Sequence, residues 1–169
     1  MADNRPLVID ETTGCQEEVV PLTTSSGAAD ASQLVQTNAA GELDETLFPS
    51  SVLNAKTFTA AEALTAGDKV YIDGSGEAAR ASAASGGNRV SGYVKDSATT
   101  GSTVTVFFDG CNDALTGLTV GATYFLSPST PGGITTTVPT GSGEMVIKVG
   151  VATSATQLEF EPEFIATRA

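Results

Sequence analysis

From about residue 56 onward, apolar and polar residues alternate over short segments, and this pattern restricts the fold more than any other feature. The alternating segments are Lys69–Ile72, Thr103–Phe108, Glu144–Val151 and Thr156–Glu161. A period of two predicts strands with one face in the core and the other in water. Clusters of Gly, Asp, Ser and Pro separate the segments, and none after residue 66 keeps a helical period. We therefore predict an all-β fold, built as an antiparallel sheet, sandwich or barrel.

The alternation also predicts which side chains are buried. The faces expected to point inward carry Val104, Val106, Phe108, Met145, Ile147, Val149, Val151, Leu158 and Phe160. The opposite face of the last strand carries Gln157, Glu159 and Glu161, which we expect in water. The chain has no Trp, and only 6% of its residues are aromatic, so the core must be built mainly from Val, Leu, Ile and Ala.

Part of the sequence is repeated. Leu64–Ile72 aligns without gaps on Leu118–Leu126, and each copy continues through a strand centred on a glycine to an alternating final strand. The copies cover about residues 61–110 and 115–162. Two copies of a three- or four-stranded unit could close into one barrel or sandwich that hides its strand edges. The alternative is that Leu-Thr-x-Gly is only a common turn sequence that precedes a strand in β proteins.

Residues 1–55 differ from the rest and are predicted to form an extended acidic arm preceding a β-domain of residues 56–169. Residues 1–50 hold 9 acids and one base, and such a segment buries too little apolar surface to order itself alone. Its apolar residues are expected to press onto a neighbour, as a strap or a single helical turn. They are Leu7, Val8, Ile9, Leu34, Val35, Leu43, Leu47 and Phe48. The alternative is a flexible linker.

The composition excludes several classes of function. There is no histidine, which removes Ser-His-Asp and Cys-His catalysis and imidazole metal sites. A net charge of -12 argues against nucleic acid and anionic membranes as partners. Cys15 and Cys111 are expected to be free thiols, with one long-range disulfide as the alternative. Without an apolar leader or membrane span, synthesis in the cytoplasm is expected.

The remaining candidates for chemistry have ordinary structural explanations. Glu159, Glu161 and Glu163 lie two apart, as the carboxylates of a glycosidase could, but a solvated strand face is the better interpretation because no Trp lines a sugar cleft. Residues 73–77 resemble the start of a calcium loop but fit a hairpin turn better. Cys111 has no histidine to activate it. We therefore assign no catalytic, cofactor or metal residues and predict that the protein is not an enzyme.

Several sequence segments resemble parts of the capsid decoration, or cement, proteins of tailed bacteriophages. They are Ala61–Ile72, Arg89–Val94, Gly101–Val106, Gly117–Leu126, Pro131–Ile134 and Val149–Ala152, while Leu34–Pro49 is similar to a phrase in phage decoration and tail-fibre proteins. The resemblance implies a small β-barrel or β-tulip domain, often trimeric, that sits where capsid subunits meet. The arm would become ordered on the shell. The family supplies no catalytic residues.

The resemblance leads to an expected function and two rivals. We expect a structural virion protein, made in the host cytoplasm, that binds the outer surface of a phage head and stabilises it by bridging subunits. Its partners would be the major capsid protein and two further copies of itself in a homotrimer. The first rival is a tail-fibre or receptor-binding module. The second is a glycan depolymerase that uses the Glu159, Glu161 and Glu163 row.

Overall fold

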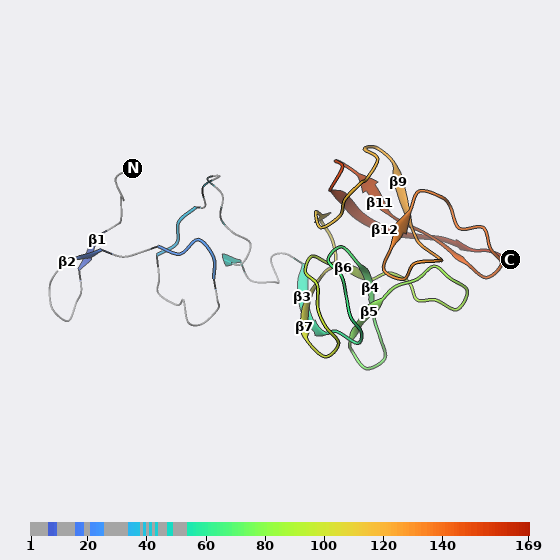
Figure 1. Cartoon of the computed structure of the whole chain (residues 1–169), viewed down its shortest axis with the longest axis horizontal. Helices are drawn as coiled ribbons and strands as arrows, with labels where there is room; N and C mark the ends of the chain where they lie inside the picture. Colours follow the sequence, from blue (N-terminus) through green and yellow to red (C-terminus); the bar gives the residue numbers. More distant parts are fainter. Residues whose placement is uncertain are drawn as a thin grey trace. The chain divides into compact units, whose positions relative to one another are not determined.

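The computed structural model describes residues 7–9, 16–18, 21–25, 34–37, 39, 41, 43, 47, 48 and 54–169. The chain divides into two compact units, Met1–Val52 and Leu53–Ala169 (Figure 1). In the first unit, β1 (Leu7–Ile9) pairs antiparallel with β2 (Gln16–Glu18). Leu22 forms an isolated parallel bridge with Val35.

The second unit consists of two five-stranded antiparallel sheets, and its residues 54–169 contain no α-helix. The first sheet has the order β3-β7-β6-β4-β5. Its strands are β3 (Ala55–Thr59), β4 (Lys69–Ile72), β5 (Ala78–Arg80), β6 (Gly92–Val94) and β7 (Thr103–Phe107). The second has the order β8-β12-β11-β9-β10. Its strands are β8 (Cys111–Asn112), β9 (Thr123–Leu126), β10 (Ile134–Thr135), β11 (Met145–Ala152) and β12 (Leu158–Thr167).

The first sheet curls until its two edge strands meet. Ala60, just after β3, forms a parallel bridge with Ala78 of β5, and Ala61 N donates to Ala78 O at 2.9 Å. The concave side encloses a small apolar core of Ala60, Leu64, Val70, Ala78, Val94, Val104 and Val106, with Phe108 packed against it. The inward face predicted for Thr103–Phe108 is therefore confirmed. So is the prediction of an all-β, barrel-like antiparallel domain.

The second sheet is more irregular because its longest strands carry bulges. β11 pairs with β12 along its length, with register shifts between Val146 and Ile147 and between Lys148 and Gly150. Met145, Ile147 and Val149 are buried as predicted. Val151 is not: relative to β9, β11 has one extra residue between Lys148 and Gly150, and this bulge changes the phase of the alternation. Ala152 therefore takes the inward place and Val151 is only half-buried. Leu158 and Phe160 are buried, and Glu159 and Glu161 are exposed, as predicted.

One apolar cluster joins the two sheets. Tyr93 of β6 stacks on Phe107 of β7 with a ring-centroid distance of 5.6 Å, and it meets Phe160 of β12 edge-on at 5.1 Å. The cluster also includes Tyr124, Leu126, Met145, Ile147, Val149, Ala152 and Leu158 from the second sheet, and Ala55, Ala81 and Ala83 from the first half of the unit. The two sheets therefore share a core.

The two sheets also have the same topology. Strands that occupy equivalent places in the two sheets differ by five in number. β3 corresponds to β8, for example, and β7 corresponds to β12. The repeated segments Leu64–Ile72 and Leu118–Leu126 lie at equivalent places in the two sheets. The last four residues of the first form β4, and the last four of the second form β9. The turns before these strands match as well, with Gly67 and Gly121 both at positive φ. Asp68 N donates to Thr65 O, and Ala122 N donates to Thr119 O, both at 3.0 Å.

Candidate functional site

The apolar residues singled out in the arm lie at the surface of the first unit where their side chains are described. Leu34, Val35, Leu43 and Phe48 expose between 41% and 52% of their surface, and Leu47 is half-buried. The backbone places Leu34 and Val35 beside Leu22, whose N donates to Leu34 O at 2.7 Å. Leu7, Val8 and Ile9 form β1. The structure thus leaves large apolar side chains of an acidic segment in contact with water.

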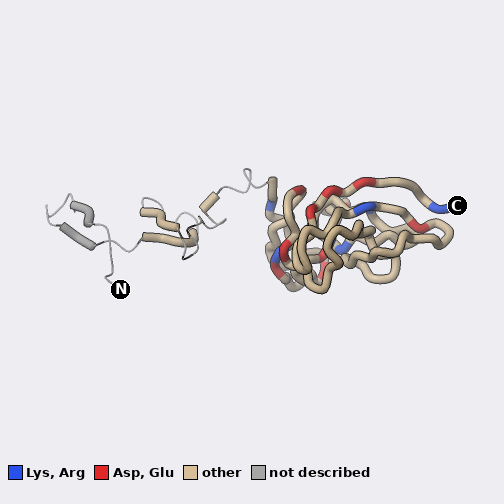
Figure 2. The backbone as a smooth tube through the Cα atoms, turned by 90° about the horizontal axis from the view of Figure 1, so that it is seen from above, with Lys and Arg blue, Asp and Glu red and all other residues tan. Residues whose placement is uncertain are grey.

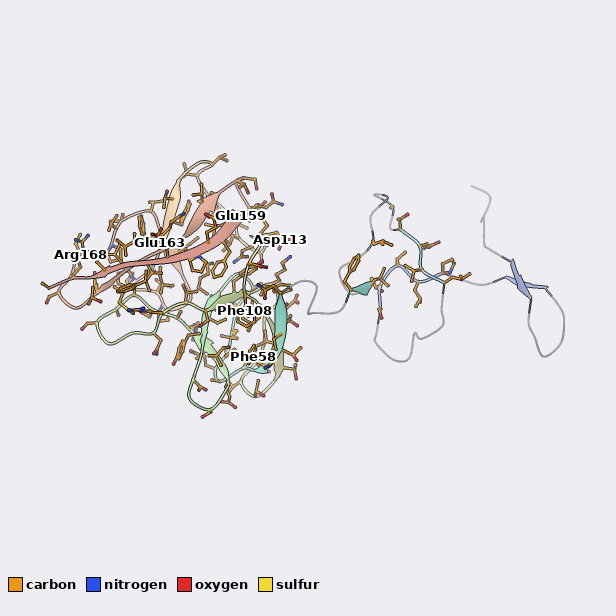
Figure 3. All side chains as sticks on the ribbon, turned by 180° about the vertical axis from the view of Figure 1, so that it is seen from behind. Phe58, Phe108, Asp113, Glu159, Glu163 and Arg168 are labelled. Carbon is orange, nitrogen blue, oxygen red and sulfur yellow. The ribbon has the colours of Figure 1, made fainter. Side chains whose placement is uncertain are left out.

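A shallow hollow lies beside β3 in the curled sheet. It has a volume of about 590 Å³ and is lined by Lys56, Thr57, Phe58, Thr59, Ile72, Gly76 and Thr103. Phe58 meets Phe108 edge-on with ring centroids 6.2 Å apart (Figure 3). The Lys56 ammonium lies 5.4 Å from the Phe58 ring centroid. The lining combines one aromatic ring, an ammonium and a few hydroxyls in an open hollow, groups that suit contact with another surface.

A second hollow of about 410 Å³ lies at the other sheet. It is lined by Ser127, Pro128, Ser129, Thr135, Thr137, Val138, Pro139, Thr140, Gly141 and Glu144. Its carboxylate, Glu144, accepts a hydrogen bond from Gly141 N at 2.8 Å and so braces its own turn. The lining contains no Lys or Arg, and no base lies beside its Ser and Thr hydroxyls to activate them.

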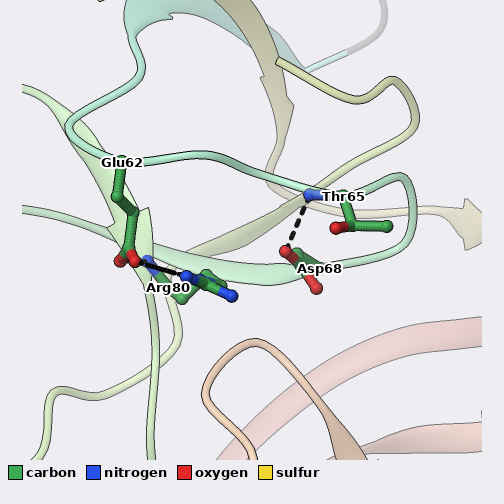
Figure 4. A network of polar contacts seen from close by, with 4 residues as sticks. All are labelled: Glu62, Thr65, Asp68 and Arg80. Carbon is green, nitrogen blue, oxygen red and sulfur yellow. Dashed lines mark hydrogen bonds and ion pairs between the residues drawn. The ribbon is translucent and has the colours of Figure 1, made fainter. Parts of the chain in front are cut away.

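An ion pair joins Arg80 of the edge strand β5 to Glu62, which follows the end of the other edge strand, β3 (Figure 4). Glu62 accepts three hydrogen bonds from Arg80, from N and Nε at 3.0 Å and from Nη2 at 2.7 Å. Partial burial raises the pKa of Glu62, but these hydrogen bonds and the Arg80 charge outweigh it and hold that pKa below its ordinary value. The bridge therefore stays ionised at neutral pH and closes the seam where Ala60 meets Ala78.

Asp68 lies in the same network and titrates differently. Burial raises its pKa above the ordinary value, although Thr65 N donates to its carboxylate at 2.9 Å and Arg80 and Lys69 lower the pKa. The hydrogen bond closes the turn that leads into β4. Asp68 is therefore held by its own turn, a role that needs no ligand.

A buried polar group lies between the sheets. Lys69 is 1% exposed, and its ammonium donates to Gly67 O. Asn112 Nδ2 donates to the same oxygen at 3.2 Å, and Asn112 Oδ1 accepts from Ala114 N at 3.2 Å. Burial lowers the pKa of Lys69 to about 8, against the opposing charge of Asp68. In the described part of the chain, every buried side-chain nitrogen and oxygen has a hydrogen-bond partner.

The alternation of Lys69–Ile72 correctly predicted a strand but gave no sign that Lys69 is buried. Lys69 points away from Val70, which faces the curled core, so in a lone sheet Lys69 would lie in water. The second sheet covers that face. The Glu62–Arg80 pair was also missed, because the two residues lie 18 positions apart and no pattern in the sequence indicates that their side chains meet.

The acidic row of β12 is exposed and its spacing is irregular. A register shift falls between Phe160 and Glu163, so the strict period of two that would align Glu159, Glu161 and Glu163 is broken. All three are exposed, and Glu161 pairs with Lys148 at 3.4 Å. Figure 3 shows Glu159 and Glu163 at separate places along β12. The row resembles a solvated strand face.

Cys111 carries a free thiol, and Cys15 lies outside the described residues. Burial, with the nearby charges of Glu159 and Asp113, raises the pKa of the Cys111 thiol, so the thiolate is scarce at neutral pH. Among the residues that the structure describes, no three Cys, Asp or Glu side chains converge as metal ligands do.

Residues 73–77 form the predicted hairpin turn between β4 and β5. Asp73 Oδ1 accepts hydrogen bonds from Ser75 N at 2.8 Å and Glu77 N at 2.9 Å. An Asp that bonds the backbone two residues ahead is typical of a turn.

Comparison with known proteins adds no identity to this geometry. No protein-family model matches the chain, and none of the curated proteins is significantly similar to it. Within the described residues, the structure has no helix that is long and apolar enough to span a membrane.

Proposed function

We propose that this protein is a structural component of a tailed-phage virion that binds the outside of the capsid and stabilises the shell by bridging its subunits. The observation that carries the proposal is the exposure of Leu34, Val35, Leu43 and Phe48 in an acidic arm that precedes a well-packed β-domain. Large apolar side chains that are exposed to water together are typical of interaction sites. The resemblance of Leu34–Pro49 and of the repeated β segments to decoration proteins points to a capsid as the partner.

The mechanism would depend on buried area and would need no chemistry. Each copy would contact more than one capsid subunit, so that separating the subunits also requires breaking the contacts made by the decorating protein. The β-domain would serve as a rigid body, because its two sheets share one core. The arm would supply the apolar contacts. Binding through two connected parts raises the effective concentration of the second contact once the first has formed.

The first experiment measures copy number. Quantitative mass spectrometry of purified virions gives the ratio of this protein to the major capsid protein. A ratio of the same order as the capsid protein supports a protein that covers the shell. A handful of copies per particle contradicts it.

A pair of substitutions tests the role of the arm. Leu47→Ser with Phe48→Ser should weaken binding to capsids by about tenfold or more, because two large apolar contacts are lost. Capsid binding is measured by co-sedimentation with capsids that lack the protein. Val120→Ser is the matched control, because Val120 is 64% exposed but lies in the β-domain. If the double variant binds as well as the control, the arm is only a linker.

A tail-fibre or receptor-binding module is the second candidate. The observation that favours it is the open hollow beside β3, where Phe58, Lys56 and several threonines could contact a host surface molecule. Phe58→Ala should then reduce adsorption of the phage to its host while leaving capsid stability unchanged. Unaltered adsorption would remove this candidate.

A further inference from the structure

β12 has a neighbouring strand on each edge, and it extends well beyond one of them, β8. β11 pairs with one edge from Leu158 to Thr167. On the other edge, β8 pairs only with Leu158 and Glu159, and Phe160 N donates to Gly110 O at 2.9 Å. From Glu161 to Thr167, no strand in the described part of the chain pairs with that edge. Residues 161–165 are all exposed.

The repeated topology explains why the edge is uncovered. In the first sheet, β3 covers the equivalent strand β7 from Thr103 to Phe107 with five residue pairs. β8 cannot do the same for β12, because the residues just before Cys111 already belong to β7 and to the Asp109–Gly110 turn. The second sheet therefore lacks most of a strand that the first sheet has.

The uncovered edge is apolar in the middle and oppositely charged at its ends. Phe164 and Ile165 are 38% and 54% exposed, and the Arg89 guanidinium lies 3.6 Å from the Phe164 ring centroid. Glu161 and Glu163 precede them, and Arg168 follows, its Nε donating to Pro139 O at 3.0 Å. Figure 2 shows acidic positions along this side of the domain and a basic one beside the C-terminus. Pro162 lacks a backbone donor, so strand pairing is confined to the residues around Phe164 and Ile165.

We propose that β12 pairs edge to edge and antiparallel with β12 of a second copy of this chain, about a two-fold axis. The antiparallel orientation sets the end of β12 that carries Glu161 and Glu163 beside the end of the partner strand that precedes Arg168, with the apolar residues Phe164 and Ile165 in the centre. A parallel pairing would instead set glutamates against glutamates, which is unfavourable. The sheet of one copy would continue into that of the other. This pairing does not depend on the proposed capsid role.

The oligomeric state of the full chain tests the pairing. Sedimentation equilibrium of the wild-type protein should show a mass that rises toward two chains with concentration. Ile165→Asp should hold it at one chain without lowering the melting temperature, because Ile165 is exposed. Val120→Asp, which changes another exposed apolar residue, should behave as wild type. A wild-type mass equal to that of Ile165→Asp, as a monomer or as any larger assembly, overturns the proposal.

A charge exchange tests the orientation. Glu161→Arg and Arg168→Glu should each weaken the dimer by about fivefold or more, and the double variant should recover most of the loss because opposite charges again meet at the two ends of the paired strands. Failure of the double variant to recover overturns the antiparallel orientation. Hydrogen exchange supplies a second measure. Amides of residues 163–167 should exchange faster in Ile165→Asp than in wild type, whereas those of Leu158 and Phe160 should not change.

Discussion

Lys69 is a charged residue in surroundings that disfavour its charge. Its ammonium is buried between the two sheets and donates to a single backbone oxygen, that of Gly67. Removing an ammonium from water disfavours its charged form, which is why burial lowers its pKa from 10.5 to about 8. The unfolded chain holds this proton more tightly than the folded one. Burial of Lys69 therefore opposes folding at neutral pH.

Lys69→Met should stabilise the protein at pH 7. Below about pH 8 the folded protein carries the full penalty, and between about pH 8 and 10.5 the folded state loses its proton before the unfolded state does. Wild-type stability should therefore rise with pH over this window by an amount of order 2–3 kcal/mol relative to Lys69→Met. Urea unfolding of both proteins at about pH 7 and pH 9.5 measures the difference.

The comparison of two proteins is needed because other groups titrate in the same range. Tyr93 and Cys111 have raised pKa values, so the folded state keeps their protons longer, and both lower stability as the pH rises. They are present in wild type and in Lys69→Met, so their effects cancel. Gly67 O keeps Asn112 as a donor in the variant. If the difference in unfolding free energy between Lys69→Met and wild type does not narrow as the pH rises, burial of the Lys69 charge is not what destabilises the wild-type protein.

At the scale of the elements, each sheet has a glycine where two strands approach closely. A Cβ on Gly92 of β6 would lie 2.5 Å from Phe107 O, and a Cβ on Gly150 of β11 would lie 1.8 Å from Glu159 O. Both obstacles are backbone atoms of the next strand, at equivalent places in the two sheets. The glycines centred in the predicted strands are therefore required by packing of the main chain.

Gly150→Ala should destabilise the protein by about 3 kcal/mol or more, because neither β11 nor β12 can move without breaking its ladder. Gly74→Ala is the matched control: nothing lies within 4 Å of its Cβ position. Its effect should stay within about 0.5 kcal/mol. Thermal unfolding of both variants measures the difference. Equal melting temperatures would mean that β11 and β12 are not locked as the structure has them.

At the scale of the whole molecule, the shared core should make the two sheets of the β-domain unfold together. Leu126 is fully buried in the cluster that contains Tyr93 and Phe107 of the first sheet. Leu126→Ala should lower the free energy of unfolding by about 2–5 kcal/mol. It should also speed amide exchange in β4 and β6 as much as in β9 and β11.

Val120→Ala is the control for this prediction, because it removes methyl groups from an exposed position and should change stability by less than about 0.5 kcal/mol. Faster exchange limited to the second sheet would contradict the prediction. It would mean that each sheet has its own stability and that the cluster between them is only a contact surface.

The sequence by itself determined the all-β class, the strands and most of their buried faces. It could do so because alternation with a period of two depends only on neighbouring residues. Tertiary structure alone decided where that phase changes, as the bulge in β11 does when it exchanges Val151 for Ala152. It also decided which polar residues meet: Glu62 with Arg80, Lys69 with Asn112. Such contacts depend on how the first sheet curls and the second covers it, and strand pairing between distant segments leaves no local pattern in the sequence.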